Sequence, residues 1–211
     1  MLTGSVTFVG AGPGAADCIT VRGARLLAQA DVVLHDALTD PALRQWAPRA
    51  RWVHVGKRGY RDSTAQSEIN ALMIDHARCG ARVVRLKGGD PSVFGRLEEE
   101  LQALHAAGLP TEVVPGVTAA LAAAAATQRP LTRRGSGRSV GLATAVTESR
   151  ALRGGRRADT EVFYMAGTRL GELSRRLQAS GWPGETPVLV VSRVLWPDQL
   201  ASDHLLRNLE E

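Results

Sequence analysis

Two glycine-rich segments each follow a short predicted strand. Gly10-Ala-Gly-Pro-Gly14 comes directly after Val6-Thr-Phe-Val9, and Lys87-Gly-Gly-Asp-Pro91 comes directly after Arg82-Val-Val-Arg-Leu86. Because glycine carries no side chain, a ligand can approach its backbone closely. Asp90 would then be a carboxylate beside bare backbone, able to accept hydrogen bonds from hydroxyl or ammonium groups. We expect a ligand site here; the simpler alternative is that Asp-Pro only marks a turn.

The first glycine segment also has a loose likeness to the dinucleotide-binding pattern GxGxxG/A, with Ala15 in place of the third glycine. A phosphate-binding turn depends on backbone N–H groups, and Pro13 removes one of them. A nicotinamide-dependent oxidoreductase therefore remains an alternative, but a weak one.

Asp36 and Lys57 each follow another predicted strand and are candidates for proton transfer or charge stabilisation. An unperturbed aspartate is a poor base at neutral pH and would need help from its surroundings. The 26 basic residues include only two lysines, Lys57 and Lys87, both beside glycines. Lysine is a compact, flexible donor whereas arginine is a rigid fork, so a site that needs the first cannot use the second.

Predicted strands and helices alternate along the chain, which indicates an α/β fold with a mostly parallel sheet whose ligands bind at the carboxyl ends of the strands. The expected strands are residues 6–9, 32–34, 52–55, 82–86, 111–114, 139–144, 160–165 and 187–192. The expected helices are residues 20–30, 40–46, 63–78, 98–107, 118–127 and 170–180, with Ser63 or Thr64 as the cap of the third. We expect an N-terminal α/β domain over residues 1–114 and a smaller, mixed α/β domain over 115–211, because the composition changes at Pro115-Gly116.

Charge and composition narrow the classes of partner. The net charge is +5, which favours an anionic partner. The arginines are scattered apart from a cluster at 150–157, and no aromatic-rich motif accompanies them, so a small polyanion is a better candidate than nucleic acid. The sequence contains no uncharged apolar stretch of about 18 residues, which argues against a membrane span.

The remaining composition argues for a cytoplasmic protein without a metal. The N-terminal residues lack the pattern of a signal peptide. Cys18 and Cys79 are far apart in sequence, which excludes a disulfide scaffold and fits a reducing compartment. The five histidines show no metal-ligand spacing, so we expect no metal.

Several motifs taken together resemble the uroporphyrinogen-III C-methyltransferases, a tetrapyrrole methyltransferase family. They are VGAGPG, ADVVLHDAL, VGKR, QSEIN, VVRLKGGDPSVFGR, EVVPGVTAALAAAA and PLTRR, in this order. The resemblance implies a homodimeric, two-domain, metal-independent enzyme of the cytoplasm. Such an enzyme uses S-adenosylmethionine, leaves S-adenosylhomocysteine, and methylates uroporphyrinogen III at C2 and C7 to give precorrin-1 and then precorrin-2. These products feed siroheme, cobalamin or heme d1, and the substrate's eight carboxylates fit an arginine-rich site.

The resemblance also assigns roles to individual positions. Asp36 matches the family's proton acceptor and Lys57 its proton donor. Arg58, Arg96 and Arg134 are candidates for binding substrate carboxylates. The positions that match donor-binding residues are Pro13, Gly88, Gly89, Asp90, Val93, Thr118, Ala119, Met165 and Val194.

Some positions depart from the family pattern. FGRGGEE reads Phe94-Gly-Arg-Leu-Glu-Glu-Glu100, PLTHR has Arg133 in place of histidine, and Val194 replaces a glycine that approaches the donor. We expect a changed or weaker donor contact at Val194. Two alternatives follow: a methyltransferase acting on a different tetrapyrrole, and a ligand-binding relative with reduced catalysis.

Overall fold

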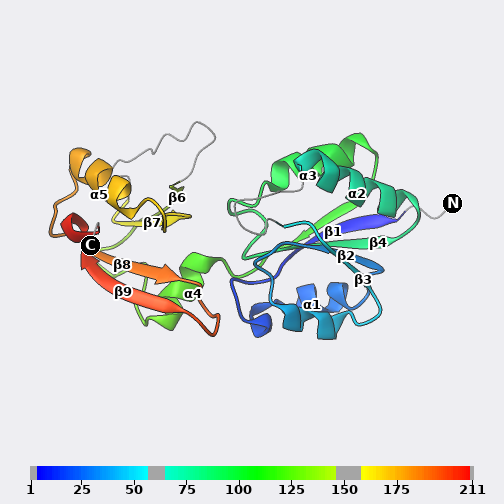
Figure 1. Cartoon of the computed structure of the whole chain (residues 1–211), viewed down its shortest axis with the longest axis horizontal. Helices are drawn as coiled ribbons and strands as arrows, with labels where there is room; N and C mark the ends of the chain where they lie inside the picture. The colour runs from blue at the N-terminus through cyan, green and yellow to red at the C-terminus, as the bar shows by residue number, and fades with distance from the viewer. Residues whose placement is uncertain (1–3, 57–64, 146–157, 210–211) are drawn as a thin grey trace. The chain divides into compact units, whose positions relative to one another are not determined.

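The structure is a computed structural model that describes residues 4–56, 65–145 and 158–209. It divides into two compact units, Met1–Ala119 and Ala120–Glu211, each described by itself below (Figure 1). Lys57, Arg58 and the two expected helix caps, Ser63 and Thr64, lie outside the described residues.

The first unit is built on a five-stranded sheet in which every neighbouring pair of strands is parallel, in the order β3-β2-β4-β1-β5. The α/β fold expected from the sequence is therefore confirmed. The strands begin and end within a residue or two of their predicted bounds: β1 Ser5–Gly10, β2 Val32–His35, β3 Arg51–His54, β4 Arg82–Lys87 and β5 Thr111–Val114.

Helices cover both faces of this sheet (Figure 1). They are α1 Val21–Leu27, α2 Gln66–Arg78 and α3 Leu97–Ala106, with the 3₁₀ helices η1 Ala16–Cys18 and η2 Pro41–Trp46. The helix expected at 40–46 is a 3₁₀ helix and not an α-helix. Asp40 caps it by accepting a hydrogen bond from the Ala42 N–H at 2.9 Å, and Pro41 occupies its first turn.

Two apolar cores lie on the two faces of the sheet, and alternation along β4 divides its side chains between them. Val83 packs with Ile69 and Met73 of α2 and Leu104 of α3. Its neighbour Val84 belongs to the opposite core, which includes residues of α1 and η2. β4 is therefore buried on both faces, including its basic residues Arg85 and Lys87.

The carboxyl ends of the central strands β1 and β4 mark where a ligand site is expected. β1 leads to η1 and α1 on one face, whereas β4 leads to α3 on the other, so the chain leaves these two adjacent strands in opposite directions. In parallel α/β sheets, ligands bind in the crevice that such a divergence opens at the carboxyl ends.

The second unit contains two small sheets. β6 Val140–Thr144 and β7 Thr160–Tyr164 are parallel, and β8 Pro187–Ser192 and β9 Leu200–Leu205 are antiparallel. α5 Leu170–Ala179 and the 3₁₀ helix η3 Leu206–Asn208 pack together around Leu173 and Leu177, and α4 spans Ala119–Ala126.

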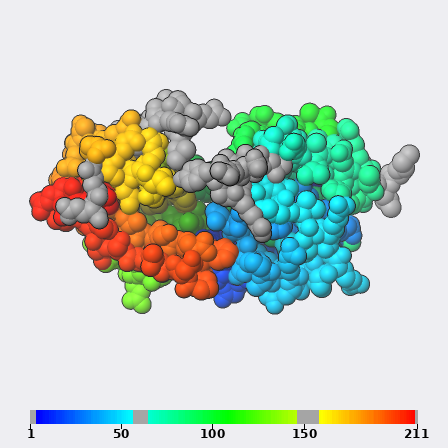
Figure 2. Space-filling model, in the orientation of Figure 1, coloured from blue at the N-terminus to red at the C-terminus, as the bar shows by residue number. Residues whose placement is uncertain are grey.

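The strand β9 was not predicted from the sequence. Most of its residues are exposed, Leu200 to 71%, and the β8–β9 pair forms visible surface of this unit in Figure 2 (orange to red). Among the helices of the described residues, none is both long and apolar enough to cross a bilayer.

Candidate active site

The glycine loops after β1 and β4 are joined directly to each other. The Gly89 N–H donates to the Gly12 carbonyl at 2.7 Å, and the Gly12 N–H donates back to the Gly89 carbonyl at 3.3 Å. Both residues have positive φ, +80° for Gly12 and +70° for Gly89, which glycine adopts without steric cost. The two predicted ligand loops therefore form one continuous edge.

Asp90 ties the loop after β5 to this edge. One carboxylate oxygen accepts a hydrogen bond from the Ser92 N–H at 2.8 Å, and the other accepts from the Gly116 N–H at 2.8 Å. The sequence predicted a carboxylate offered to a ligand. The structure shows that Asp90 holds two segments of backbone in place, with the second lone pair of each oxygen as its remaining acceptor capacity.

Space around the glycines differs sharply from one position to another. A Cβ built on Gly10 would lie 2.5 Å from the Gly116 Cα, so these two backbones pack against each other. A Cβ built on Gly89 would meet its nearest atom, the Thr118 Cα, only at 3.9 Å. A Cβ on Gly89 would thus be in ordinary contact with Thr118, so the backbone at Gly89 is far less crowded than that at Gly10, and a ligand can approach it more closely.

The other predicted donor contacts of this unit flank the same loops. Pro13 is half-buried and follows Gly12 in the chain, and Ala119 begins α4 directly after Thr118. The Val93 N–H donates to the Asp90 carbonyl at 3.2 Å, so a backbone contact to a ligand there would use the Val93 carbonyl.

Asp36 lies at the carboxyl end of β2, where its N–H donates to the Leu86 carbonyl of β4 at 3.3 Å. Its carboxylate accepts a hydrogen bond from Arg85 Nη2 at 2.6 Å. The Asp36 side chain is 29% exposed, whereas that of Arg85 is 3% exposed. The candidate proton acceptor therefore reaches solvent on one side and contacts a buried cation on the other.

Arg85 and Lys87 share one buried partner on α3. Glu100 accepts from Arg85 Nε at 3.0 Å and from Lys87 Nζ at 2.6 Å. Burial opposes the charged form of Arg85, but the carboxylates of Asp36 and Glu100 together raise the pKa of its guanidinium. Burial, reinforced by the positive charge of Arg85, lowers the pKa of the Lys87 ammonium, while Glu100 opposes this shift.

His35 precedes Asp36 and is half-buried. Its Nδ1 lies 3.2 Å from the Asp36 carbonyl and 3.2 Å from Thr39 Oγ1. The ring stacks at an angle near His54 and Trp52, with centroids 5.1 Å and 5.5 Å away. Burial lowers the pKa of His35, and the nearby His54 lowers it further. The imidazole is thus held neutral beside the candidate proton acceptor.

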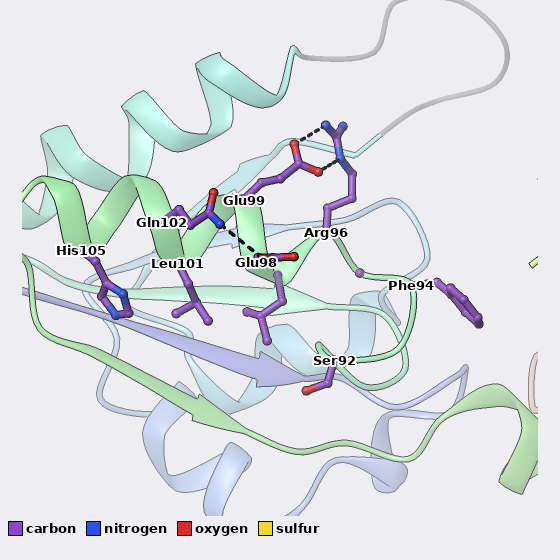
Figure 3. Close-up of a pocket in the computed structure, with 10 residues that line it drawn as sticks. Ser92, Phe94, Arg96, Glu98, Glu99, Leu101, Gln102 and His105 are labelled. Carbon is purple, nitrogen blue, oxygen red and sulfur yellow. Dashed lines mark hydrogen bonds and ion pairs between the residues drawn. The ribbon is translucent and has the colours of Figure 1, made fainter. Parts of the chain in front are cut away.

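Arg96, a predicted substrate contact, precedes α3 in the left-handed region, with φ of 55°. It is exposed, and its Nε and Nη2 donate to the Glu99 carboxylate at 2.8 Å and 2.6 Å (Figure 3). A surface groove of about 630 Å³ passes beside it. The groove is lined by Ser92, Phe94, Gly95, Arg96, Leu97, Glu98, Glu99, Leu101, Gln102 and His105.

Three predicted site residues belong to the second unit. Met165 follows β7 with φ of 58° and is 56% exposed. Val194 is 7% exposed, and positive φ values occur at its neighbours, 51° at Arg193 and 60° at Leu195. Arg134 is exposed in a turn closed by two hydrogen bonds between Arg133 and Gly137.

The sequence reasoning missed the roles of Arg85 and Glu100. Arg85 was included in a predicted strand and Glu100 was noted only as part of a family motif. One signal was available: a charged residue inside a run that is otherwise apolar must find a partner when it is buried. Within the described residues, His, Cys, Asp and Glu side chains form no group of three that could hold a metal ion.

A parallel α/β sheet with paired glycine loops at its carboxyl edge defines a class of ligand-binding α/β proteins. The sequence profile of the Tetrapyrrole (Corrin/Porphyrin) Methylases matches residues 5–210. The chain belongs to this family.

Individual relatives are consistent with the family. The chain is 44% identical over 204 residues to a uroporphyrinogen-III C-methyltransferase of Pseudomonas aeruginosa, covering 94% of this chain and 82% of the relative. It is 42% identical over 214 residues to a siroheme synthase of Actinobacillus pleuropneumoniae. That match covers 99% of this chain and 44% of the relative. A crystal structure of uroporphyrin-III C-methyl transferase from Thermus thermophilus complexed with S-adenyl homocysteine superimposes with a TM-score of 0.85 at 37% identity. That match covers 98% of this chain and 85% of the other.

Proposed function

We propose that this chain transfers methyl groups from S-adenosylmethionine to C2 and C7 of uroporphyrinogen III, giving precorrin-2 by way of precorrin-1. The observation that carries the proposal is the Gly12–Gly89 pairing, with no atom closer than 3.9 Å to a Cβ built on Gly89. The similarity to the Pseudomonas aeruginosa enzyme and to the Thermus thermophilus structure supports the same reaction.

The residues at this edge fit the methyl donor. Gly88 and Gly89 offer uncrowded backbone, since a Cβ on Gly88 would be in ordinary contact with Leu38 at 3.4 Å and one on Gly89 in ordinary contact with Thr118 at 3.9 Å. Asp90 keeps these segments in register through Ser92 and Gly116. We assign donor binding in the first unit to Pro13, Val93, Thr118 and Ala119 as well. On the family resemblance we also assign donor-binding roles to Met165 and Val194.

S-adenosylmethionine, when bound, supplies an electrophilic methyl group. The chain's own task is to align a pyrrole carbon and to take away the proton that methylation of that carbon releases. We assign the Asp36 carboxylate as the proton acceptor and Lys57 as the proton donor. Arg85 Nη2 donates a charge-assisted hydrogen bond of 2.6 Å to the Asp36 carboxylate and so fixes its direction.

The substrate carries carboxylates, for which we propose Arg58, Arg96 and Arg134 as partners. Arg96 pairs with Glu99 on an exposed surface, and such a pair is weak in water. Arg96 can therefore release Glu99 and bind a substrate carboxylate in its place. Two further parts of the proposal come from composition: domains at 1–114 and 115–211, and a cytoplasmic location. The family resemblance adds a homodimer.

The test has two measurements on the purified chain. Calorimetry with S-adenosylhomocysteine is expected to show binding, and anaerobic incubation with uroporphyrinogen III and the donor is expected to add two methyl groups by mass spectrometry. Addition of one methyl would favour a different natural tetrapyrrole. Binding without turnover would favour a ligand-binding relative, and no heat from folded protein would overturn the proposal.

A further inference from the structure

Strand β4 carries two cationic side chains into the interior of the first unit. Val83, Arg85 and Lys87 alternate onto one face of the sheet, and Val83 packs in the core beneath α2 and α3. The side chains of Arg85 and Lys87 are each only 3% exposed. Charges buried this deeply require partners, because their desolvation is costly.

Glu100 of α3 is the shared partner of both cations. Its side chain is 1% exposed, and its two oxygens are divided between Arg85 Nε at 3.0 Å and Lys87 Nζ at 2.6 Å. Gln66 Nε2 of α2 donates to the oxygen that Arg85 uses, at 3.3 Å. Glu100 is thus held by groups from two elements and has little freedom to turn.

The guanidinium of Arg85 is engaged at all three of its nitrogens. Nε contacts Glu100, Nη1 donates to the Leu86 carbonyl at 3.3 Å and Nη2 donates to Asp36 at 2.6 Å. Because the guanidinium is planar, fixing Nε on Glu100 also fixes the direction of Nη2. The position of the Asp36 carboxylate is therefore determined by a residue on α3 that it does not contact.

We infer that Arg85 and Glu100 are positioning residues for Asp36: Glu100 orients the Arg85 guanidinium, which in turn sets the direction and charge balance of the Asp36 carboxylate at the edge of the sheet. This inference rests on the role proposed for Asp36 above. The network holds two basic and two acidic side chains. Lys87, its fourth member, directly precedes Gly88.

Few ionisable groups of the described residues interact with the Asp36 carboxylate. Arg85 and Lys87 on β4 and His35 on β2 interact with it electrostatically, and Glu100 lies behind the two cations. Removal of the Arg85 guanidinium takes away the donor that Asp36 contacts. Removal of the Glu100 charge leaves that donor in place but no longer fixes its direction. A residue that only supported packing would not lower turnover while KM and donor affinity are kept.

The experiment compares Arg85→Met and Glu100→Gln with the wild-type chain. In both variants, turnover is expected to fall on the order of 10- to 100-fold, because the Asp36 carboxylate is present but no longer held in its direction. The KM for uroporphyrinogen III is expected to change little, so the loss appears in kcat. Both variants are expected to keep S-adenosylhomocysteine affinity within about three-fold, since their donor loops keep Asp90 and its contacts.

Arg82→Met is the matched control. Arg82 lies on the same strand and makes a similar Arg–Asp pair, to Asp31, but at the exposed opposite end. The Arg82→Met variant is expected to keep both the turnover and the KM of the wild type. If Glu100→Gln does not fold, the double variant Lys87→Met/Glu100→Gln restores charge balance in the interior and is expected to show the same loss of turnover.

A second readout is independent of turnover. The NMR chemical shift of the Asp36 carboxyl carbon at one fixed pH, assigned with Asp36→Asn, is expected to change in Arg85→Met and Glu100→Gln and to stay the same in Arg82→Met. An unchanged chemical shift in both variants, or wild-type turnover in Glu100→Gln, would overturn the inference. An inactive wild-type chain whose variants still show the changed chemical shift would contradict the proposed function and leave the positioning of Asp36 supported.

Discussion

The Asp90 carboxylate accepts a hydrogen bond from the Gly116 N–H at 2.8 Å, across 26 positions of sequence. This contact joins the loop after β4 to the loop after β5, and the Gly12–Gly89 pair joins the loop after β1 to the same edge. Three loops from adjacent strands are thus linked without the help of a ligand. A site held in this way needs little reorganisation on binding, which favours affinity.

Replacing Asp90 tests this linkage. Asp90→Ala leaves the N–H groups of Ser92 and Gly116 without their acceptor, so the free energy of unfolding is expected to fall by about 1–3 kcal/mol. S-adenosylhomocysteine binding is expected to weaken about ten-fold or more because the loops lose their register. Denaturant titration and calorimetry measure the two effects. Asp75→Ala, at an exposed position of α2, is the control, and equal behaviour of the two variants would contradict the role of Asp90.

Alanine substitutions at two glycines of the same edge are expected to impair different properties of the protein. In Gly10→Ala the new Cβ would lie 2.5 Å from the Gly116 Cα, so the loss should appear as reduced stability. In Gly89→Ala the nearest atom is 3.9 Å away, and the fold bears only the strain of φ at +70°, about 1 kcal/mol. The loss there should appear as weaker S-adenosylhomocysteine binding. Wild-type affinity in folded Gly89→Ala would show that no ligand occupies the space beside it.

The parts of the fold that were predictable are those specified by local pattern. β-branched runs bounded by glycine or proline marked β1, β4 and β5 closely. β9 was missed because Ala201, Ser202, Asp203 and His204 give an exposed strand no apolar alternation. Parallel strands present their carboxyl ends at one edge, and this rule alone predicts that Asp36, Gly89 and Asp90 share that edge.

The side-chain partners were not predictable in the same way. Asp36 and Arg85 meet because β4 lies next to β2, and Glu100 meets both cations because α3 crosses that face. Strand order and helix placement are properties of the whole fold, and no local pattern around Arg85 or Glu100 specifies them. Sequence reasoning therefore located the edge but not the network beneath it.

Asp36→Asn tests the proton acceptor itself. The amide keeps the size of the side chain and an acceptor oxygen for Arg85, but it cannot take a proton from the substrate. Turnover with uroporphyrinogen III is expected to fall about 10²- to 10⁴-fold while S-adenosylhomocysteine binding is kept. Single-turnover kinetics and calorimetry measure these two quantities. Asp31→Asn, an exposed aspartate ahead of the same strand, serves as the control, and unchanged turnover in Asp36→Asn would remove Asp36 from the mechanism.

His35 is expected to make stability depend on pH. Burial lowers the pKa of its imidazole below the ordinary value of 6.5, and His54 and Arg44 add to the effect while Asp36 opposes it. Below about pH 6.5, His35 is therefore protonated in the unfolded chain at pH values where it is still neutral in the folded chain. Because the unfolded state then holds more protons, the free energy of unfolding falls as pH decreases from about 6.5 toward the folded-state pKa.

Denaturant titrations of the wild type and His35→Asn at several pH values between about 5 and 7.5 measure this slope. The wild type is expected to lose stability toward the acid end more steeply than His35→Asn, with the two curves parallel above about pH 6.5. His105→Asn, at an exposed position on α3, should follow the wild type. Equal slopes in wild type and His35→Asn would show that the buried imidazole accepts its proton as readily in the folded as in the unfolded chain.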